Sequence, residues 1–246
     1  MRRGESTTCR FPVLGLPVHL HQSYTDWLVN RFHRKLGTHV VTLNAEMAMQ
    51  AERHQPLTDI IHKAELVIPD GAGVVLYLRL KGKYIQRSPG IEVAESLIQK
   101  VAQQTDNDLV FFYGGKPNVA QRATEYFQRQ MPHLAIASYH GYLSSSEEQQ
   151  LKETLEDLQP RLILVGLGVP RQELWIAKHR HLCPNSIWIG VGGSFDIWAG
   201  VKKRAPDWLG NNHLEWLYRL YQEPWRWRRM MALPQFALKS LITFGN

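Results

Sequence analysis

The sequence is poor in cysteine and has no long apolar run. Only two cysteines, Cys9 and Cys183, occur in 246 residues, which excludes a disulfide framework and a cysteine-rich zinc site. No segment approaches the ~18 consecutive apolar residues of a membrane-spanning helix, and prolines interrupt the apolar stretch at residues 11–17. We therefore expect a protein of the reducing cytoplasm, without a membrane span or an export leader.

Several motifs of nucleotide and metal chemistry are also missing. The chain contains no G-x-x-x-x-G-K-[ST] phosphate loop and no H-E-x-x-H zinc motif. The stretch from Gly166 to Arg171 holds only two of the three glycines of a dinucleotide-binding fingerprint. Asp106-Asn-Asp108 has the form of a metal-binding D-x-D, but it precedes a predicted strand, which favours a turn between elements. We predict no P-loop nucleotidase, no NAD enzyme, no bound metal and no other cofactor.

What the chain does contain is a globular composition with an uneven charge. Hydrophobic residues make up 44% and charged residues 21% of the sequence, as in soluble folded proteins. The net charge is +7, and the segment from residue 201 onward carries +5 of it, with eight Lys/Arg and three Asp/Glu. A local basic patch indicates an anionic partner, either nucleic acid, lipid headgroups or a phosphorylated substrate.

Short apolar runs alternate with helical segments along most of the chain. The runs lie at residues 39–43, 66–68, 109–112, 135–137, 162–165 and 186–189. Helix-capping residues such as Asn44 and Ser144 open the segments between them. This alternation predicts an α/β, Rossmann-like fold with a largely parallel sheet flanked by helices. We assign this core to residues 1–206 and a basic, aromatic helical appendage to residues 207–246.

Two of the predicted strands end at glycine. Gly166-Leu-Gly168 leads to Gln172 and Glu173, and Gly190-Val-Gly-Gly193 leads to Asp196. Ligands of open α/β sheets bind at the carboxyl ends of strands, where glycine lets the backbone approach a phosphate. We therefore predict a phosphorylated ligand, with Gln172 and Glu173 facing its ribose or base. The alternative for Glu173 is favourable placement in the first turn of a helix.

Polar side chains also follow two earlier strands. Thr42 and Asn44 can bind a sugar or a nucleotide, and Asn44 equally suits a helix cap. Asp70 lies in the turn Pro69-Asp-Gly71, where it is either a catalytic base or a turn-forming side chain. Since an unperturbed aspartate has a pKa of ~3.9, position and not basicity would supply most of its catalytic effect.

The appendage combines tryptophan and arginine with an amphipathic helical spacing. Four of the eight tryptophans lie at positions 208, 216, 225 and 227, and residues 214–221 repeat apolar side chains at helical spacing. This composition is typical of a helix that lies on a membrane surface. The alternatives are a helix packed on the core with solvated arginines, or a nucleic-acid-binding surface.

The ordered set of motifs resembles the WecG/TagA/CpsF family of glycosyltransferases, from about Val13 to the C-terminus. The motifs are Thr42-Leu-Asn44, Pro69-Asp-Gly71, Gly114-Gly115, His140-Gly141, the stretches 166–173 and 190–196, Ala199-Gly200, Lys203-Arg-Ala-Pro206, residues 214–220 and Glu223-Pro224. The resemblance implies inverting, metal-independent transfer of a sugar, such as N-acetylmannosamine, from a UDP-sugar to a polyprenyl-diphosphate-linked sugar in cell-surface polysaccharide synthesis. A UDP-sugar hydrolase is the nearest alternative activity.

The resemblance also implies where the protein works. We expect a cytoplasmic protein bound peripherally to the inner membrane. The sequence leaves the oligomeric state open, and an exposed apolar tail would favour a homo-oligomer when no membrane is present. Nucleic acid is not an expected partner, and a non-enzymatic nucleic-acid-binding protein is the remaining alternative class.

Particular residues take roles by the same resemblance. Asp70 matches the family's proposed base. Donor and acceptor binding is assigned to Thr42, Asn44, Arg87, Gly168, Gln172, Glu173, Gly193 and Asp196. Arg87 belongs to an R-x-x-G stretch in which many relatives have aspartate in place of Glu92. The lipid diphosphate and the membrane are assigned to Arg204, Arg219, Arg226 and Arg229, because guanidinium groups bind diphosphates through paired hydrogen bonds.

Overall fold

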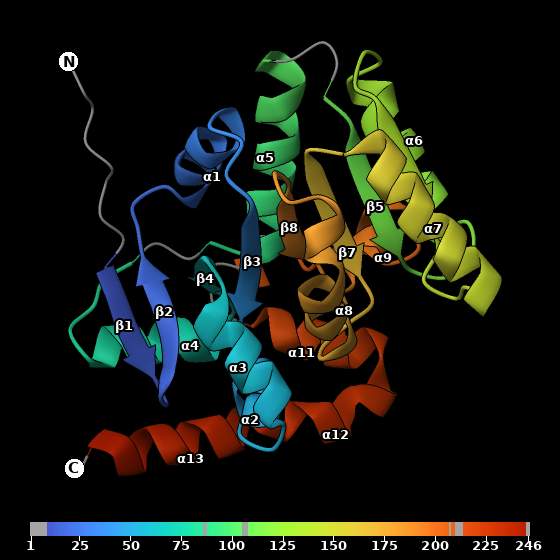
Figure 1. Cartoon of the computed structure of the whole chain (residues 1–246). Helices are drawn as coiled ribbons and strands as arrows, with labels where there is room; N and C mark the ends of the chain where they lie inside the picture. The colour runs from blue at the N-terminus through green and yellow to red at the C-terminus, as the bar shows by residue number, and fades with distance from the viewer. Residues whose placement is uncertain (1–8, 86–87, 105–107, 207, 210–213, 245–246) are drawn as a thin grey trace.

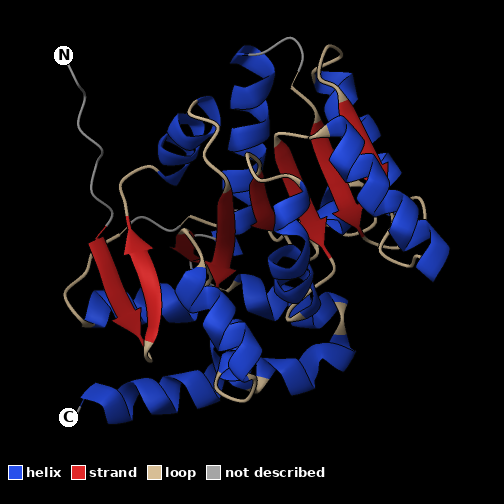
Figure 2. Ribbon diagram, viewed as in Figure 1, coloured by secondary structure: helices blue, strands red, loops and turns tan. Residues whose placement is uncertain are grey.

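Six parallel strands form one sheet at the centre of the computed structural model (Figure 1 and Figure 2). The structure describes residues 9–85, 88–104, 108–206, 208–209 and 214–244. The strands of the sheet are β3 (Thr38–Leu43), β4 (Leu66–Pro69), β5 (Val110–Gly114), β6 (Ile136–Tyr139), β7 (Leu162–Gly166) and β8 (Ile187–Gly190). Their order is β4-β3-β8-β7-β5-β6, with every neighbouring pair parallel. The predicted α/β, Rossmann-like fold is confirmed.

Helices connect these strands, and some of them begin at side-chain caps. They are α1 (Tyr24–His33), α2 (Ala45–Ala51), α3 (Gln55–Lys63), α4 (Ala72–Leu80), α5 (Gly90–Gln104), α6 (Val119–Gln130), α7 (Ser145–Leu158), α8 (Arg171–His179) with the 3-10 turn η1 (Arg180–Leu182), and α9 (Ser194–Trp198). The Asn44 side chain accepts the N–H of Met47 at 2.9 Å and opens α2. Ser144 and Glu147 form a capping box at α7, as the sequence predicts.

Alternate strand residues face two different cores. Val40 packs with α1, α5, α6 and α9 on one face of the sheet, whereas Val41 packs with α2, α3 and α4 on the other. Helices α7 and α8 continue the second face over β5, β7 and β8, where Phe111 and Trp188 are buried. Burial on both faces explains why the strands are almost continuously apolar.

An antiparallel hairpin, which the sequence analysis did not predict, extends the fold beside β4. Its strands are β1 (Cys9–Val13) and β2 (Leu16–Leu20), joined by a turn in which Leu14 and Gly15 both have positive φ. The buried His19 of β2 accepts the N–H of Val67 in β4 at its Nδ1, 2.9 Å away. The proline-broken stretch is therefore a small edge hairpin, a position that tolerates proline.

The C-terminal segment is helical and passes beneath the carboxyl ends of the strands (Figure 1). It comprises α11 (Glu215–Gln222), η2 (Pro224–Arg226), α12 (Trp227–Met230) and α13 (Ala232–Phe244). Helix α13 packs on α2 and α4 and buries Ala232 and Phe236 in their core. Its other face exposes Leu238, Leu241 and Ile242. The described residues from Glu215 onward are thus largely helical, and α13 packs one face on the core while its other face stays exposed.

Candidate functional site

Two adjoining cavities lie between the strand ends and the C-terminal helices. The basic chamber, about 130 Å³, is lined by residues that include Thr42, Asn44, Asp70, Gln172, Gly193, Lys202, Lys203, Arg204, Arg219 and Arg226. The apolar chamber, about 210 Å³, is lined by Ala45, Met47, Ala72, Val169, Trp216, Met230 and Leu233, together with Gly168, Arg219, Arg226 and Arg229 among others. Asn44, Asp70, Gly193, Arg219 and Arg226 belong to the walls of both chambers.

The two predicted glycine turns meet at one side chain. Gly168 follows β7 and Gly192 follows β8, and both have positive φ, a conformation that favours glycine. The Oε1 atom of Gln172 accepts the N–H of Gly168 at 3.2 Å and that of Gly192 at 3.0 Å. The buried Gln172 side chain thus joins both turns while it lines the basic chamber.

Thr42 and Asn44 end strand β3 beside these turns. The Thr42 hydroxyl donates to the carbonyl of Gly190 at 3.3 Å, which couples the end of β3 to the end of β8. Gly90, at the start of α5, packs against Thr42 so closely that a Cβ there would lie 2.7 Å from its Cγ2. Asn44 caps α2 and also lines both chambers, so its capping role does not remove it from the site.

Asp70 lies directly after β4, at the point where the two chambers meet. Its backbone N–H donates to the carbonyl of Leu43 at 2.8 Å, which places it level with the end of β3. Gly71 follows with φ of 79° and allows the chain to turn into α4. The carboxylate is therefore held by a tight turn in the wall common to both chambers.

Glu173 and Asp196 do not line either chamber. Glu173 is fully buried and contacts His39 of β3, with Oε2 and Nε2 2.7 Å apart. Asp196 lies in α9, and its carboxylate binds Lys202 at 2.6 Å. The same ammonium lies 3.2 Å from Glu223 of the C-terminal segment. Asp196 therefore contributes by holding Lys202 in the wall of the basic chamber.

The four arginines assigned to the lipid diphosphate all reach the chambers. Arg204 pairs with Glu92, and Arg219 pairs with Glu215 one helical turn away. Arg226 lies 3.3 Å from Glu223, and Arg229 lies 2.5 Å from Glu46. Burial lowers the pKa of Arg226, because removal from water disfavours a charged guanidinium. Each of these four guanidinium groups therefore lies beside a carboxylate.

Lys202 and Lys203 also line the basic chamber, although the sequence predicted no binding role for either and only Lys203 belongs to a quoted motif. They lie in the run Val201-Lys-Lys-Arg204, which follows α9 after Ala199 and Gly200. The signal for them was present, since a basic run that follows a glycine-rich strand end is placed to meet an anion. Arg87, by contrast, lies outside the described residues.

No group of three or more His, Cys, Asp or Glu side chains in the described part of the chain is arranged to hold a metal ion. No helix among the described residues has the length and apolar character needed to cross a bilayer.

The fold and the site define a Rossmann-like α/β protein with a basic ligand crevice at the carboxyl edge of a parallel sheet. Residues 11–244 match the model of the Glycosyl transferase WecG/TagA/CpsF family. The chain therefore belongs to this family of glycosyltransferases.

Similar proteins carry one common name, N-acetylglucosaminyldiphosphoundecaprenol N-acetyl-beta-D-mannosaminyltransferase. The chain is 36% identical to the protein of this name from Bacillus spizizenii over 91% of its own length and 83% of the relative's. It is 34% identical to the Bacillus subtilis protein over 89% and 85% of the two chains. It is 35% identical to a Staphylococcus aureus protein over 81% and 78%.

Proposed function

We propose that this glycosyltransferase moves N-acetylmannosamine, or a closely related hexose, from a UDP-sugar to a polyprenyl-diphosphate-linked sugar. The names of the similar proteins support both the sugar class and the lipid-linked acceptor. Two diphosphate-bearing substrates are consistent with a site whose two chambers share the arginines Arg219 and Arg226.

The observation that carries the proposal is the place of Asp70 in the wall between a basic and an apolar chamber. The basic chamber offers Lys202, Lys203 and the Gly192-Gly193 turn to the diphosphate of a UDP-sugar. The apolar chamber offers arginines for a second diphosphate, and Trp216, Met230 and Leu233 for the first isoprene units attached to it. A donor and an acceptor bound in this way would meet at Asp70.

The chemistry we propose is a single displacement. Asp70 accepts the proton of an acceptor hydroxyl as the hydroxyl oxygen forms a bond to the anomeric carbon. The bond from that carbon to the diphosphate breaks on the opposite side, and UDP leaves with the electron pair. One displacement inverts the anomeric centre and needs one base, unlike the two-step route of retaining enzymes. Lysine and arginine side chains would stabilise the charge that develops on the diphosphate.

We further propose that the C-terminal helices meet the membrane that carries the acceptor. Trp208, Trp225 and Trp227 are exposed, as are Leu238 and Leu241 of α13. Arg228 lies over the Trp227 ring at 5.5 Å. Tryptophan beside arginine suits the headgroup region of a bilayer, and the same helices form a wall of the apolar chamber.

A panel of UDP-sugars tests the proposed activity. UDP release is measured for each sugar, with and without N-acetylglucosaminyl-diphosphate polyprenol. Release that requires both UDP-N-acetylmannosamine and the acceptor supports transfer. Equal release without the acceptor indicates the UDP-sugar hydrolase alternative, and no release with any sugar contradicts the proposal.

A further inference from the structure

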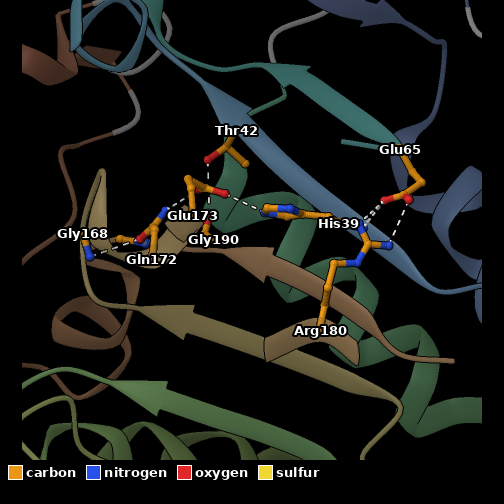
Figure 3. A network of polar contacts seen from close by, with 9 residues as sticks. His39, Thr42, Glu65, Gly168, Gln172, Glu173, Arg180 and Gly190 are labelled. Atoms are coloured by element: carbon orange, nitrogen blue, oxygen red, sulfur yellow. Dashed lines mark hydrogen bonds and ion pairs between the residues drawn. The ribbon is translucent and has the colours of Figure 1, made fainter. Parts of the chain in front are cut away.

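A polar network connects His39 and Glu173 to Gln172, which lines the basic chamber (Figure 3). Its centre is the His39–Glu173 pair, in which both side chains are at least 98% buried and their polar atoms are 2.7 Å apart. The other carboxylate oxygen of Glu173 accepts the Nε2 amide of Gln172 at 3.0 Å. Burying a polar or charged side chain lowers stability unless it has a hydrogen-bond partner. The positions of His39, Glu173 and Gln172 therefore depend on one another.

The network fixes which way the Gln172 amide points. Glu173 Oε1 can only accept when the carboxylate is ionised, so it selects the NH₂ end of the amide. The carbonyl end then faces the N–H groups of Gly168 and Gly192. A flipped amide would set its NH₂ against two backbone N–H groups and against no acceptor. The orientation of Gln172, and through it the spacing of the two turns, therefore depends on Glu173.

His39 in turn holds Glu173 and is itself anchored to the sheet. Its backbone N–H donates to Glu65 Oε2 at 2.7 Å, and Glu65 accepts two hydrogen bonds from Arg180, each 2.9 Å long. Arg180 follows the last residue of α8, whereas Gln172 lies in its first turn. Both ends of α8 are thereby tied to the β3 region, which fixes the position of the helix along the strand (Figure 3).

Strand β8 has a glycine, Gly190, where it passes Gln172 and Glu173. A Cβ at Gly190 would lie 2.3 Å from Glu173 Oε1 and 2.4 Å from Gln172 Nε2. Only glycine leaves room for both side chains to pass over β8. The glycine at the end of β8 thus serves the packing of Gln172 and Glu173, in addition to the turn that follows it.

We propose that His39 and Glu173 are positioning residues for the nucleotide diphosphate, acting through Gln172 on the Gly168 and Gly192 turns. Neither side chain lines a chamber, so any effect on binding has to pass through a neighbour. The inference rests on the proposed function only in naming UDP as the ligand. The positioning itself is a property of the ligand-free protein.

A double-mutant cycle tests this route. UDP affinity is measured by calorimetry for the wild-type protein, His39→Leu, Gln172→Ala and the double variant. His39→Leu is expected to weaken UDP binding about tenfold in the wild-type background, within the range of couplings measured inside one network. It should have no further effect when Gln172 is already alanine. An equal loss in both backgrounds, or no loss in folded His39→Leu protein, overturns the proposal.

Conservative and matched variants separate positioning from stability. Glu173→Gln keeps an acceptor for Gln172 and should retain more UDP affinity than Glu173→Leu. His39→Gln keeps a side-chain amide that can donate to Glu173, and it replaces His39→Leu if the leucine variant does not fold. His179→Leu is the control, because His179 of α8 is a buried histidine like His39 of β3 but bonds to the carbonyl of Trp175. It should lower stability without changing UDP affinity.

A second readout needs no nucleotide. Amide hydrogen exchange at Gly168 and Gly192 should accelerate in ligand-free His39→Leu and Glu173→Leu, and stay unchanged in His179→Leu. Unchanged exchange at both glycines in the first two variants overturns the positioning role. If the variants show these differences in exchange but the wild-type protein transfers no sugar, the positioning role stands and the proposed function is contradicted.

Discussion

The ring of Phe236 in α13 packs edge-on against the ring of Tyr77 in α4, with centroids 6.2 Å apart and planes at 69°. Both rings are almost fully buried. Gly73 lies one turn before Tyr77, and a Cβ there would touch the Phe236 ring at 3.6 Å. The last helix of the chain is therefore part of the hydrophobic core on one face of the sheet.

Phe236→Ala should destabilise the whole protein. Removing a buried aromatic ring costs ~3–5 kcal/mol of unfolding free energy, because transfer energy is lost and a cavity remains. Urea unfolding measures the change. Leu238→Ala on the exposed face of α13 is the matched control, since Leu238 is 61% exposed, and a change within about 0.5 kcal/mol is expected there. Equal effects of the two substitutions would show that α13 does not pack as described.

Asp70→Asn should abolish most of the turnover while fold and UDP affinity persist. The amide has the size of the carboxylate but cannot accept the acceptor's proton, and a lost general base lowers turnover by roughly two or more orders of magnitude. Steady-state transfer and UDP calorimetry measure the two properties. Asp59→Asn on the exposed surface of α3 is the control and should leave turnover unchanged. Turnover that barely changes in Asp70→Asn would place the base elsewhere.

Met230→Glu should raise the KM for the lipid acceptor more than the KM for the UDP-sugar. Met230 lines the apolar chamber, with Arg226 and Arg229 in the same wall, so a carboxylate there repels a lipid diphosphate. A penalty of ~1.4 kcal/mol corresponds to a tenfold rise in KM. Met231→Glu is the control, because Met231 is exposed and lines neither chamber. A selective rise in the donor KM would reverse the assignment of the chambers.

We expect the free energy of unfolding to decrease as the pH is lowered from about 6.5 to 4, because of His19. Burial, aided by the charge of Arg10, lowers the pKa of His19 from 6.5 to about 4. Between these two pKa values the His19 imidazole is protonated in the unfolded chain and neutral in the folded protein. Lowering the pH through this range therefore favours unfolding, and the full stabilisation is present above pH 6.5. Urea unfolding at pH 7 and pH 5 should show a larger loss for the wild type than for His19→Gln. Equal losses would remove His19 from the pH dependence.

The parts of the fold that local sequence determines were predictable. Most strands of the sheet are short apolar runs that end in a turn, and Asn44 and Ser144 cap their helices through their own side chains. The β1–β2 hairpin was not predicted, because Pro12 and Pro17 lie within its strands and proline is unusual in a strand. Its stability comes from contacts with β4, such as that between His19 and Val67.

Part of the candidate site was likewise predictable from local sequence, and part was not. Thr42 lies near the end of β3, and Asn44, Asp70 and Gln172 come after the ends of β3, β4 and β7, so the topology of a parallel sheet brings the four together. Glu173 is adjacent to Gln172 but points toward the core, because neighbouring helix positions face different directions. Its partner His39 is 134 residues away in the sequence, and no local sequence pattern predicts a contact over such a separation. Two of the arginine pairs, Arg204–Glu92 and Arg229–Glu46, are equally non-local, whereas Glu215 and Glu223 lie within one helical turn of Arg219 and Arg226.

The anomeric configuration of the product tests single-displacement transfer most directly. Wild-type protein is incubated with UDP-N-acetylmannosamine, whose sugar is α-linked, and N-acetylglucosaminyl-diphosphate polyprenol, and the released disaccharide is examined by NMR. Inversion with Asp70 as the base predicts a β-linked disaccharide from the wild type and almost none from Asp70→Asn. An α-linked product, or free N-acetylmannosamine in place of a disaccharide, would contradict it.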